Sequence, residues 1–244
     1  MNSILRMLAL MMVMVFSQPV MAGPDRELGK AVGFMRVDDV RSALEAGADP
    51  NRLSGEMRML QVACRHYSAD ESDRRTVVEL LLQAGADPNA RGQYGMTALH
   101  WSKGRIGCVA PLLAAGADPN LRGNDKTTCR YASSTAFQRI VDLLSTDDDP
   151  TAMIKGVKAL ISGGADLEMP ACQGESIHSV VADEFLRTAE RFETRNQPPS
   201  PGWWRRYTQM WAVLDAEKMA DSAAQITMKK ALEKAKDIER RAQP

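Results

Sequence analysis

One short motif recurs at four places in the chain and constrains its fold more than any other feature. Gly-Ala-Asp stands at residues 47–49, 85–87, 116–118 and 164–166, and the first three copies continue with Pro-Asn. Each copy follows a short apolar stretch. A glycine directly after such a stretch is typical of the left-handed residue that ends a helix, and Asp-Pro then directs the chain into an extended segment. The chain is therefore predicted to consist of helix-turn-helix units that repeat and stack.

The intervals between the copies are unequal, which indicates insertions within the array. From Gly47 to Gly85 is 38 residues, from Gly85 to Gly116 is 31, and from Gly116 to Gly164 is 48. In the second unit, residues 68–71 (SADE) have the form of a capping box at a lengthened helix start. Before the fourth apolar stretch, three aspartates precede Pro150, which predicts a helix with proline at its first position.

The fullest unit, residues 95–120, resembles the ankyrin-repeat family. It carries Thr97-Ala-Leu-His100 where its first helix starts, and Leu112-Leu113 before the closing Gly-Ala-Asp-Pro-Asn. The resemblance implies an all-α ankyrin-repeat solenoid of about five helix-turn-helix repeats over residues 23–194. It also implies that the histidine is structural and bonds neighbouring loops, at His100 and, in a degenerate fifth repeat, at His178. Gln61 and Arg130 stand where that histidine falls in other units, and degenerate end repeats are expected of caps.

The first 22 residues have a composition of their own. Arg6 is their only charge, residues 7–16 (MLALMMVMVF) are all apolar, and Ala22 ends the segment with a small side chain. This pattern predicts a cleavable signal peptide over residues 1–22. The apolar run is shorter than the roughly 20 residues of a membrane-spanning helix. We therefore expect an exported protein, in the periplasm.

Export would place the cysteines in an oxidising compartment, where an even number favours disulfides. Because the implied stack brings elements of adjoining repeats together, sequential pairing is the hypothesis, with Cys64 bonded to Cys108 and Cys129 to Cys172. Buried free thiols are the alternative. No C-x-x-C spacing indicates a metal site.

A Pro-rich linker at residues 195–202 separates the repeats from a C-terminal helical extension, residues 203–244. The extension is predicted to be one long or once-broken helix. Trp204, Tyr207, Trp211 and Leu214 follow helical spacing and form one aromatic stripe. We expect the stripe to dock on the repeat stack as a cap. The alternative is a helix that binds a partner or a membrane surface.

The sequence favours a binding protein over an enzyme. It contains no catalytic or nucleotide-binding motif, and neither a cofactor nor a metal ion is expected. The net charge is zero, so composition does not favour a nucleic-acid partner or an anionic membrane. We therefore expect another protein as partner and a chain that is monomeric before it binds.

The family resemblance also implies where a partner would bind. Variable contact positions lie beside the repeated glycines and along one concave face. Trp101 and Tyr131 are instead expected in the core between repeats. The predicted partner-binding residues are Arg65, His66, Arg91, Gln93, Tyr94, Met96, Lys103, Arg122, Asn124 and Lys126.

Two functions remain open at this stage. One is a periplasmic protein that neutralises or shields a partner, for example an immunity protein against a secreted toxin. The other is a structural scaffold or stabiliser of an envelope enzyme, tethered to a partner or membrane surface by the aromatic C-terminal helix.

Overall fold

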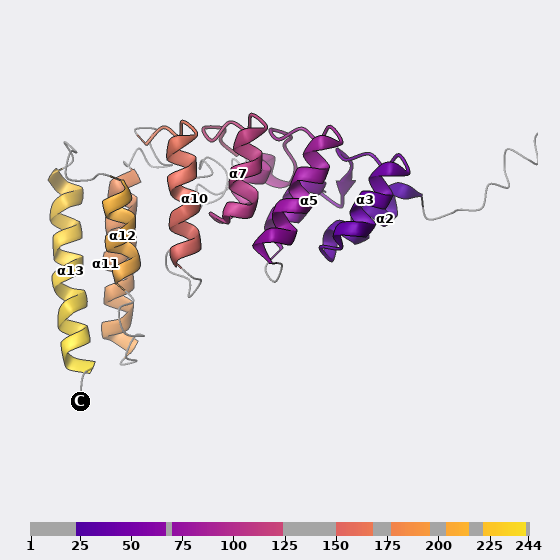
Figure 1. Ribbon diagram of the computed structural model, residues 1–244. Coiled ribbons are helices and arrows are strands. Elements are labelled where there is room, and N and C mark those ends of the chain that lie inside the picture. The colour runs from indigo at the N-terminus through magenta and orange to yellow at the C-terminus, as the bar shows by residue number, and fades with distance from the viewer. Residues whose placement is uncertain are drawn as a thin grey trace, which may run out of the picture.

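The computed structural model describes residues 23–66, 70–123, 150–167, 177–195, 204–214 and 222–242, which are mostly helical. The helices stand side by side in one row (Figure 1). Three consecutive helix pairs begin the row, and one further helix follows them. The pairs are α2 (Pro24–Gly33) with α3 (Val37–Glu45), α4 (Met59–Arg65) with α5 (Glu71–Gln83), and α6 (Ala98–Trp101) with α7 (Ile106–Ala114); the further helix is α10 (Pro150–Ser162).

The helix pairs stack in two layers. The second helices form one layer, in which α3 contacts α5, α5 contacts α7, and α7 contacts α10. The first helices form the other layer, in which α4 contacts both α2 and α6. Helix α10 begins at Pro150, as its sequence predicts. The first helix expected for the fourth unit falls within residues 124–149, outside the described residues.

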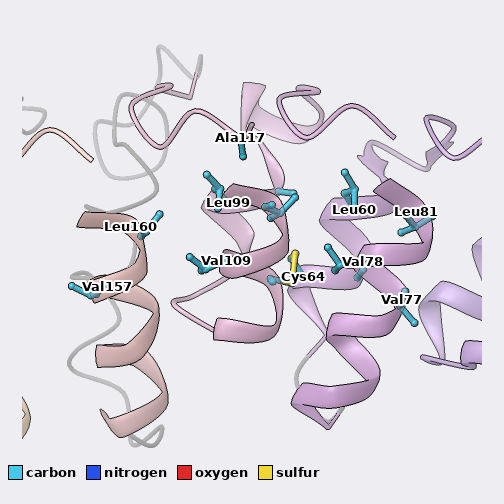
Figure 2. Close-up of a cluster of buried hydrophobic side chains, with 14 of the residues drawn as sticks. Leu60, Cys64, Val77, Val78, Leu81, Leu99, Val109, Ala117, Val157 and Leu160 are labelled. Atoms are coloured by element: carbon cyan, nitrogen blue, oxygen red, sulfur yellow. A yellow bond between two sulfur atoms is a disulfide. The ribbon is translucent and has the colours of Figure 1, made fainter. Parts of the chain in front are cut away.

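The core runs continuously along the row between these layers. Val77, Val78 and Leu81 lie on one face of α5 and are fully buried, as are Leu99 of α6 and Leu160 of α10. Figure 2 shows these side chains among the helices of successive repeats. Because each helix pair leaves one face for its neighbour, no single pair can bury its apolar surface alone, and stability comes from the stack.

The repeated turns have the geometry that the motif predicts. Gly47, Gly85, Gly116 and Gly164 have φ angles of 87°, 92°, 85° and 89°, a region that favours glycine. In the second repeat the Gly85 N–H donates to Leu82 O at 3.0 Å and the Ala86 N–H donates to Leu81 O at 2.9 Å. These bonds satisfy the last carbonyls of α5 and end the helix.

An asparagine ladder, formed by Asn51, Asn89 and Asn120, joins each turn to the next. Asn89 Nδ2 donates to Gly116 O at 3.0 Å, and its Oδ1 accepts from the Asp118 N–H at 2.8 Å. Asn51 makes the same two bonds to Gly85 and Asp87, and Asn120 makes them to Gly164 and Asp166. One side chain thus fixes both a carbonyl and an amide of the following repeat. The last of these contacts places the turn after α10 in register with the third repeat.

The ladder starts on a different residue. Asp25 in α2 stands where the ladder would need an asparagine, and its Oδ1 accepts from the Asp49 N–H at 2.8 Å. Its Oδ2 also pairs with Arg52 Nη1 at 2.7 Å. The hydrogen bond from the Asp49 N–H, and after it the bond from the Arg52 guanidinium, hold the pKa of the Asp25 carboxyl below its usual range.

Beyond the ladder the helices pack differently. Residues 177–195 were expected to contain a fifth helix-turn-helix repeat, but they form one continuous helix, α11 (Ile177–Arg195). That expectation is corrected: α11 contacts α12 (Arg205–Val213) and α13 (Ser222–Ala242), without an internal turn. The described part of the extension consists of α12 and α13, and both pack against α11.

The aromatic stripe of α12 is used inside this group. Tyr207 is 1% exposed and stacks on Phe185 of α11 with ring centroids 4.6 Å apart. Its hydroxyl lies 3.0 Å from Thr188 Oγ1, and Trp204 Nε1 donates to Glu239 at 2.7 Å. Helix α12 also contacts α10, so it covers the last described helix of the stack, as expected of a cap. Among the described helices, none combines the length and apolarity that a bilayer crossing requires.

The ladder predicts a measurable loss of stability on a single truncation. Asn89→Ala removes two hydrogen bonds between repeats, and because both are solvent-accessible we expect the free energy of unfolding to fall by about 1–2 kcal/mol. Urea denaturation followed by far-UV circular dichroism measures this change. Asn89→Asp is the matched control, since it keeps the acceptor for Asp118 and should lose less. Equal stability of Asn89→Ala and the unchanged chain would show that the ladder contributes nothing.

Asp25 predicts a pH dependence that an asparagine should remove. The lowered pKa means that the carboxylate stabilises the fold above its unfolded value of about 3.9, and that this contribution is lost as the pH falls below it. Asp25→Asn keeps the acceptor for Asp49 and offers an amide to Gly47, as Asn51 does to Gly85. We compare the melting temperature of the variant minus that of the unchanged chain at two pH values. We expect this difference to be larger at about pH 3.5 than at about pH 7, because only the unchanged chain loses the Asp25 carboxylate. The same difference at both pH values would contradict this role.

Candidate functional site

Two connecting segments project between the turns and the first helices. Residues 51–58 contain β1 (Leu53–Ser54) and β2 (Met57–Arg58), which pair antiparallel with Leu53 opposite Arg58. Residues 89–97 contain a single 3-10 turn, η1 (Gln93–Gly95). We define the finger surface as the exposed and half-buried side chains of residues 51–58, 89–95 and 121–123. It runs along the stack because its segments come from successive repeats.

An arginine row, made of Arg58, Arg91 and Arg122, links these segments. Arg58 Nε donates to Arg91 O at 3.3 Å, and Arg91 Nη1 donates to Arg122 O at 2.5 Å. Arg91 Nη1 also donates to Gly95 O at 2.7 Å within its own segment. Carbonyl partners hold a guanidinium in place without neutralising it. Arg58 and Arg91 therefore present ordered positive charge along the finger surface.

Exposed apolar side chains lie on the same surface. Leu53 is 45% exposed and Tyr94 is 50% exposed. Between them, Gln93 Nε2 donates to Glu56 Oε2 at 3.0 Å, which joins the two segments. Tyrosine and arginine are the residue types most often found at the energetic centres of protein interfaces.

Arg65 and His66 lie at the end of α4, near the finger surface. The guanidinium of Arg65 lies 5.4 Å from the centroid of the Trp101 ring, and its Nη1 lies 3.3 Å from Met57 Sδ. His66 is half-buried, and its carbonyl accepts from Arg74 at 2.8 Å. Trp101 packs against the core, as the sequence predicts for a residue between repeats.

Arg74 fixes His66 from within the protein. Its side chain is 1% exposed and pairs with Glu71, whose other oxygen accepts from the Gly107 N–H at 2.7 Å. Burial lowers the pKa of the Arg74 guanidinium, and the Glu71 carboxylate opposes that shift. His66 is thereby connected to both α5 and α7.

The structure corrects one predicted contact and leaves others untested. Met96 is fully buried, so it cannot touch a partner; it precedes the first-helix cap and its side chain joins the interior. Lys103 is half-buried in the turn after α6. Asn124, Lys126, Tyr131, Cys129 and Cys172 lie outside the described residues, as does the side chain of His178.

Sequence reasoning passed over the first connecting segment, which contributes Leu53, Glu56 and Arg58. A signal for it was present, since Asn51 begins this segment just as Asn89 begins the next. The segment from Asn51 to the start of α4 is one residue shorter than the segment from Asn89 to the start of α6. Gln61 also replaces the family histidine, so the two segments look less alike in sequence than they are in structure.

Gln61 and His100 perform matching tasks behind the finger surface. The Arg58 N–H donates to Gln61 Oε1 at 3.0 Å, and Gln61 Nε2 donates to Met96 O in the next repeat at 2.6 Å. His100 Nδ1 accepts from the Thr97 N–H at 3.1 Å. Both side chains are buried, and each caps the first helix of its own repeat.

Charge is separated between the two sides of the stack although the whole chain is neutral. The connecting segments and first helices, residues 23–36, 51–66, 89–105 and 121–123, carry ten basic and three acidic side chains. The second helices, α10 and the turns beside them, residues 37–49, 70–87, 106–118 and 150–166, carry five basic and eleven acidic ones. The finger surface therefore belongs to the positive side. Among the described residues, no group of three or more His, Cys, Asp or Glu could hold a metal ion.

A disulfide joins α4 to α7 beneath this surface. Cys64 is bonded to Cys108, with 5.7 Å between their Cα atoms, and both residues are fully buried. This is the first of the two pairs expected from the sequence. The bond links the first helix of one repeat to the second helix of the next, across 44 residues of chain.

Comparison with protein families agrees with this geometry. Residues 28–123 match the family model described as ankyrin repeats (3 copies). That range extends from α2 through the three helix pairs to the end of the third turn. A search of curated proteins finds no match to the chain. Ankyrin repeats generally mediate protein–protein interaction and are typically non-enzymatic, so the repeats indicate a protein partner.

The disulfide predicts a redox-dependent stability. Replacing both residues, Cys64→Ala with Cys108→Ala, removes a cross-link over 44 residues and should lower the free energy of unfolding by about 2–4 kcal/mol. Urea denaturation of the oxidised and reduced chain, beside the double variant, measures the effect. The reductant should shift the unfolding midpoint of the double variant less than that of the unchanged chain. Peptide mapping without reductant that recovers Cys64 and Cys108 as free thiols would contradict the bond.

Proposed function

We propose that this chain is a periplasmic protein-binding module that neutralises or shields one partner, in the manner of an immunity protein against a secreted toxin. The observation that carries the proposal is the finger surface on stacked ankyrin repeats. Its segments are locked to one another by the arginine row, and its exposed residues include Tyr94 and Leu53. A surface ordered before binding loses less conformational entropy when a partner docks.

Two features support export. Residues 1–22 have the pattern of a signal peptide. The Cys64–Cys108 disulfide is the kind of bond that persists in oxidising compartments and is rare in the cytosol. A neutralising role in the periplasm needs no catalytic centre, only a surface that covers the active region of its partner.

The alternative function is a scaffold or stabiliser of an envelope enzyme, tethered by the aromatic C-terminal helix. The aromatic stripe was the feature that most favoured this alternative. Tyr207 and Trp204 now have partners in α11 and α13, which leaves the stripe less available to a partner or a membrane surface. We therefore place the binding function on the finger surface.

Fractionation and affinity capture test the proposal. The full chain with a C-terminal tag is expressed in its own host or a Gram-negative relative, and the periplasmic fraction is captured and analysed by mass spectrometry. We expect a mature chain that starts at Gly23, in the periplasm, with one partner in stoichiometric amount. Purified chain should then suppress the activity or toxicity of that partner.

Other outcomes separate the alternatives. A stoichiometric partner whose activity rises or whose half-life lengthens would favour the scaffold. Flotation with anionic vesicles in the absence of any partner would favour the tether. A chain that keeps residues 1–22 and stays in the cytoplasm would overturn the proposed location.

A further inference from the structure

Resting on the proposed function, we infer that the finger surface recognises an acidic partner: a protein segment whose carboxylates align with Arg58 and Arg91. The inference names the chemistry of the partner, which the family match does not. It depends on the separation of charge across the stack and on the spacing of the arginine row.

The spacing of the row sets the size of the complementary feature. Each arginine belongs to a successive connecting segment, and each of the first two donates to the backbone of the next. Neighbouring helices pack about 8–10 Å apart, so the guanidinium groups of Arg58 and Arg91 are about 10 Å apart. An extended segment of about three or four residues covers that length. A partner with acidic side chains at both ends of such a segment could meet both groups.

The charges of Arg58 and Arg91 are available to a ligand. Both side chains donate to carbonyl oxygens, which leaves their positive charges uncompensated by those bonds. Arg91 is exposed, and Arg58 and Arg122 are half-buried. The one acidic residue of the surface, Glu56, is bonded to Gln93. A guanidinium held in a fixed position binds a carboxylate with less loss of side-chain entropy than a free one.

Apolar contacts beside the row favour a protein over a polyanion. Leu53 and Tyr94 are about half exposed and lie in the same two segments as Arg58 and Arg91. The arginines would attract nucleic acid, but its phosphate backbone offers no apolar group to pack on Leu53. An acidic segment with interspersed apolar residues uses both kinds of contact.

The test selects ligands from a random library, so the natural partner need not be identified first. A phage-displayed library of random linear peptides is panned against the full purified chain, and against a row variant with Arg58→Gln, Arg91→Gln and Arg122→Gln. Glutamine keeps a donor for the carbonyl bonds but removes the charge. A control variant removes three exposed basic residues elsewhere, with Arg41→Gln, Lys229→Gln and Lys230→Gln.

We expect peptides enriched by the unchanged chain and the control to be rich in Asp and Glu, and the row variant to lose this enrichment. For one synthetic peptide from the selection, fluorescence anisotropy should show at least about a tenfold weaker affinity for the row variant. For the unchanged chain, affinity should fall about fivefold or more between about 50 and about 300 mM NaCl. Peptides without acidic enrichment, or equal affinity for the row variant, would overturn the inference. So would a DNA duplex that binds where acidic peptides do not.

A second variant keeps the inference testable if the row variant does not fold. Leu53→Ser with Tyr94→Asn changes two exposed side chains that hold no repeat together, and asparagine tolerates the φ of 59° at position 94. We expect this variant to bind the selected peptide about fivefold more weakly. Unchanged affinity would overturn the inference.

The outcome is separable from that of the proposed function. Acidic peptides that bind through the row, without any partner in the periplasm, would leave the surface assigned and the neutralising role rejected. A periplasmic partner that binds the row variant as well as the unchanged chain would leave the function standing and reject the acidic recognition.

Discussion

The stack depends on a side chain that bonds the backbone of the following repeat through both ends of its amide. Asn51, Asn89 and Asn120 each donate to a glycine carbonyl and accept from an aspartate amide, at distances of 2.8–3.0 Å. Because the turns are fixed to each other, the helices below them share one register. The core in the two helix layers and the arginine row on the connecting segments both inherit that register.

The turns were readable from sequence because they depend on local chemistry, whereas the number of helix pairs was not: about five repeats were expected, and the described residues show three pairs followed by α10. A left-handed glycine and an Asp-Pro step have strong positional preferences, so Gly47, Gly85 and Gly116 marked helix ends without any tertiary information. The Cys64–Cys108 pair followed once the stacking order was assumed. The contact positions were less accurate: Met96 is two residues from the exposed Tyr94 but is fully buried.

Features that depend on distant packing were not predictable. Residues 177–195 contain a degenerate repeat signature, yet α11 runs through it because its apolar face meets α13. Gly156 looks unfavourable within a helix. A Cβ atom there would lie 2.7 Å from Gly104 Cα, so its value lies in a close approach to the turn before α7. Neither fact is visible without knowing which elements become neighbours.

The ladder also has a direction, and that direction bears on how the molecule remains a closed unit. Each asparagine side chain bonds the turn of the following repeat, and each turn is bonded by the asparagine of the repeat before it, which is a head-to-tail pattern. A stack with an unused rung at each end could add further copies of itself and grow into a filament. Here Asp25 and Arg52 occupy the first of these ends, Glu168 stands after the last turn where earlier repeats have the ladder asparagine, and α12 covers α10. The asparagine pattern therefore stops at both ends, with an aspartate before the first turn and a glutamate after the last, and neither end repeats the rung that a further copy would need.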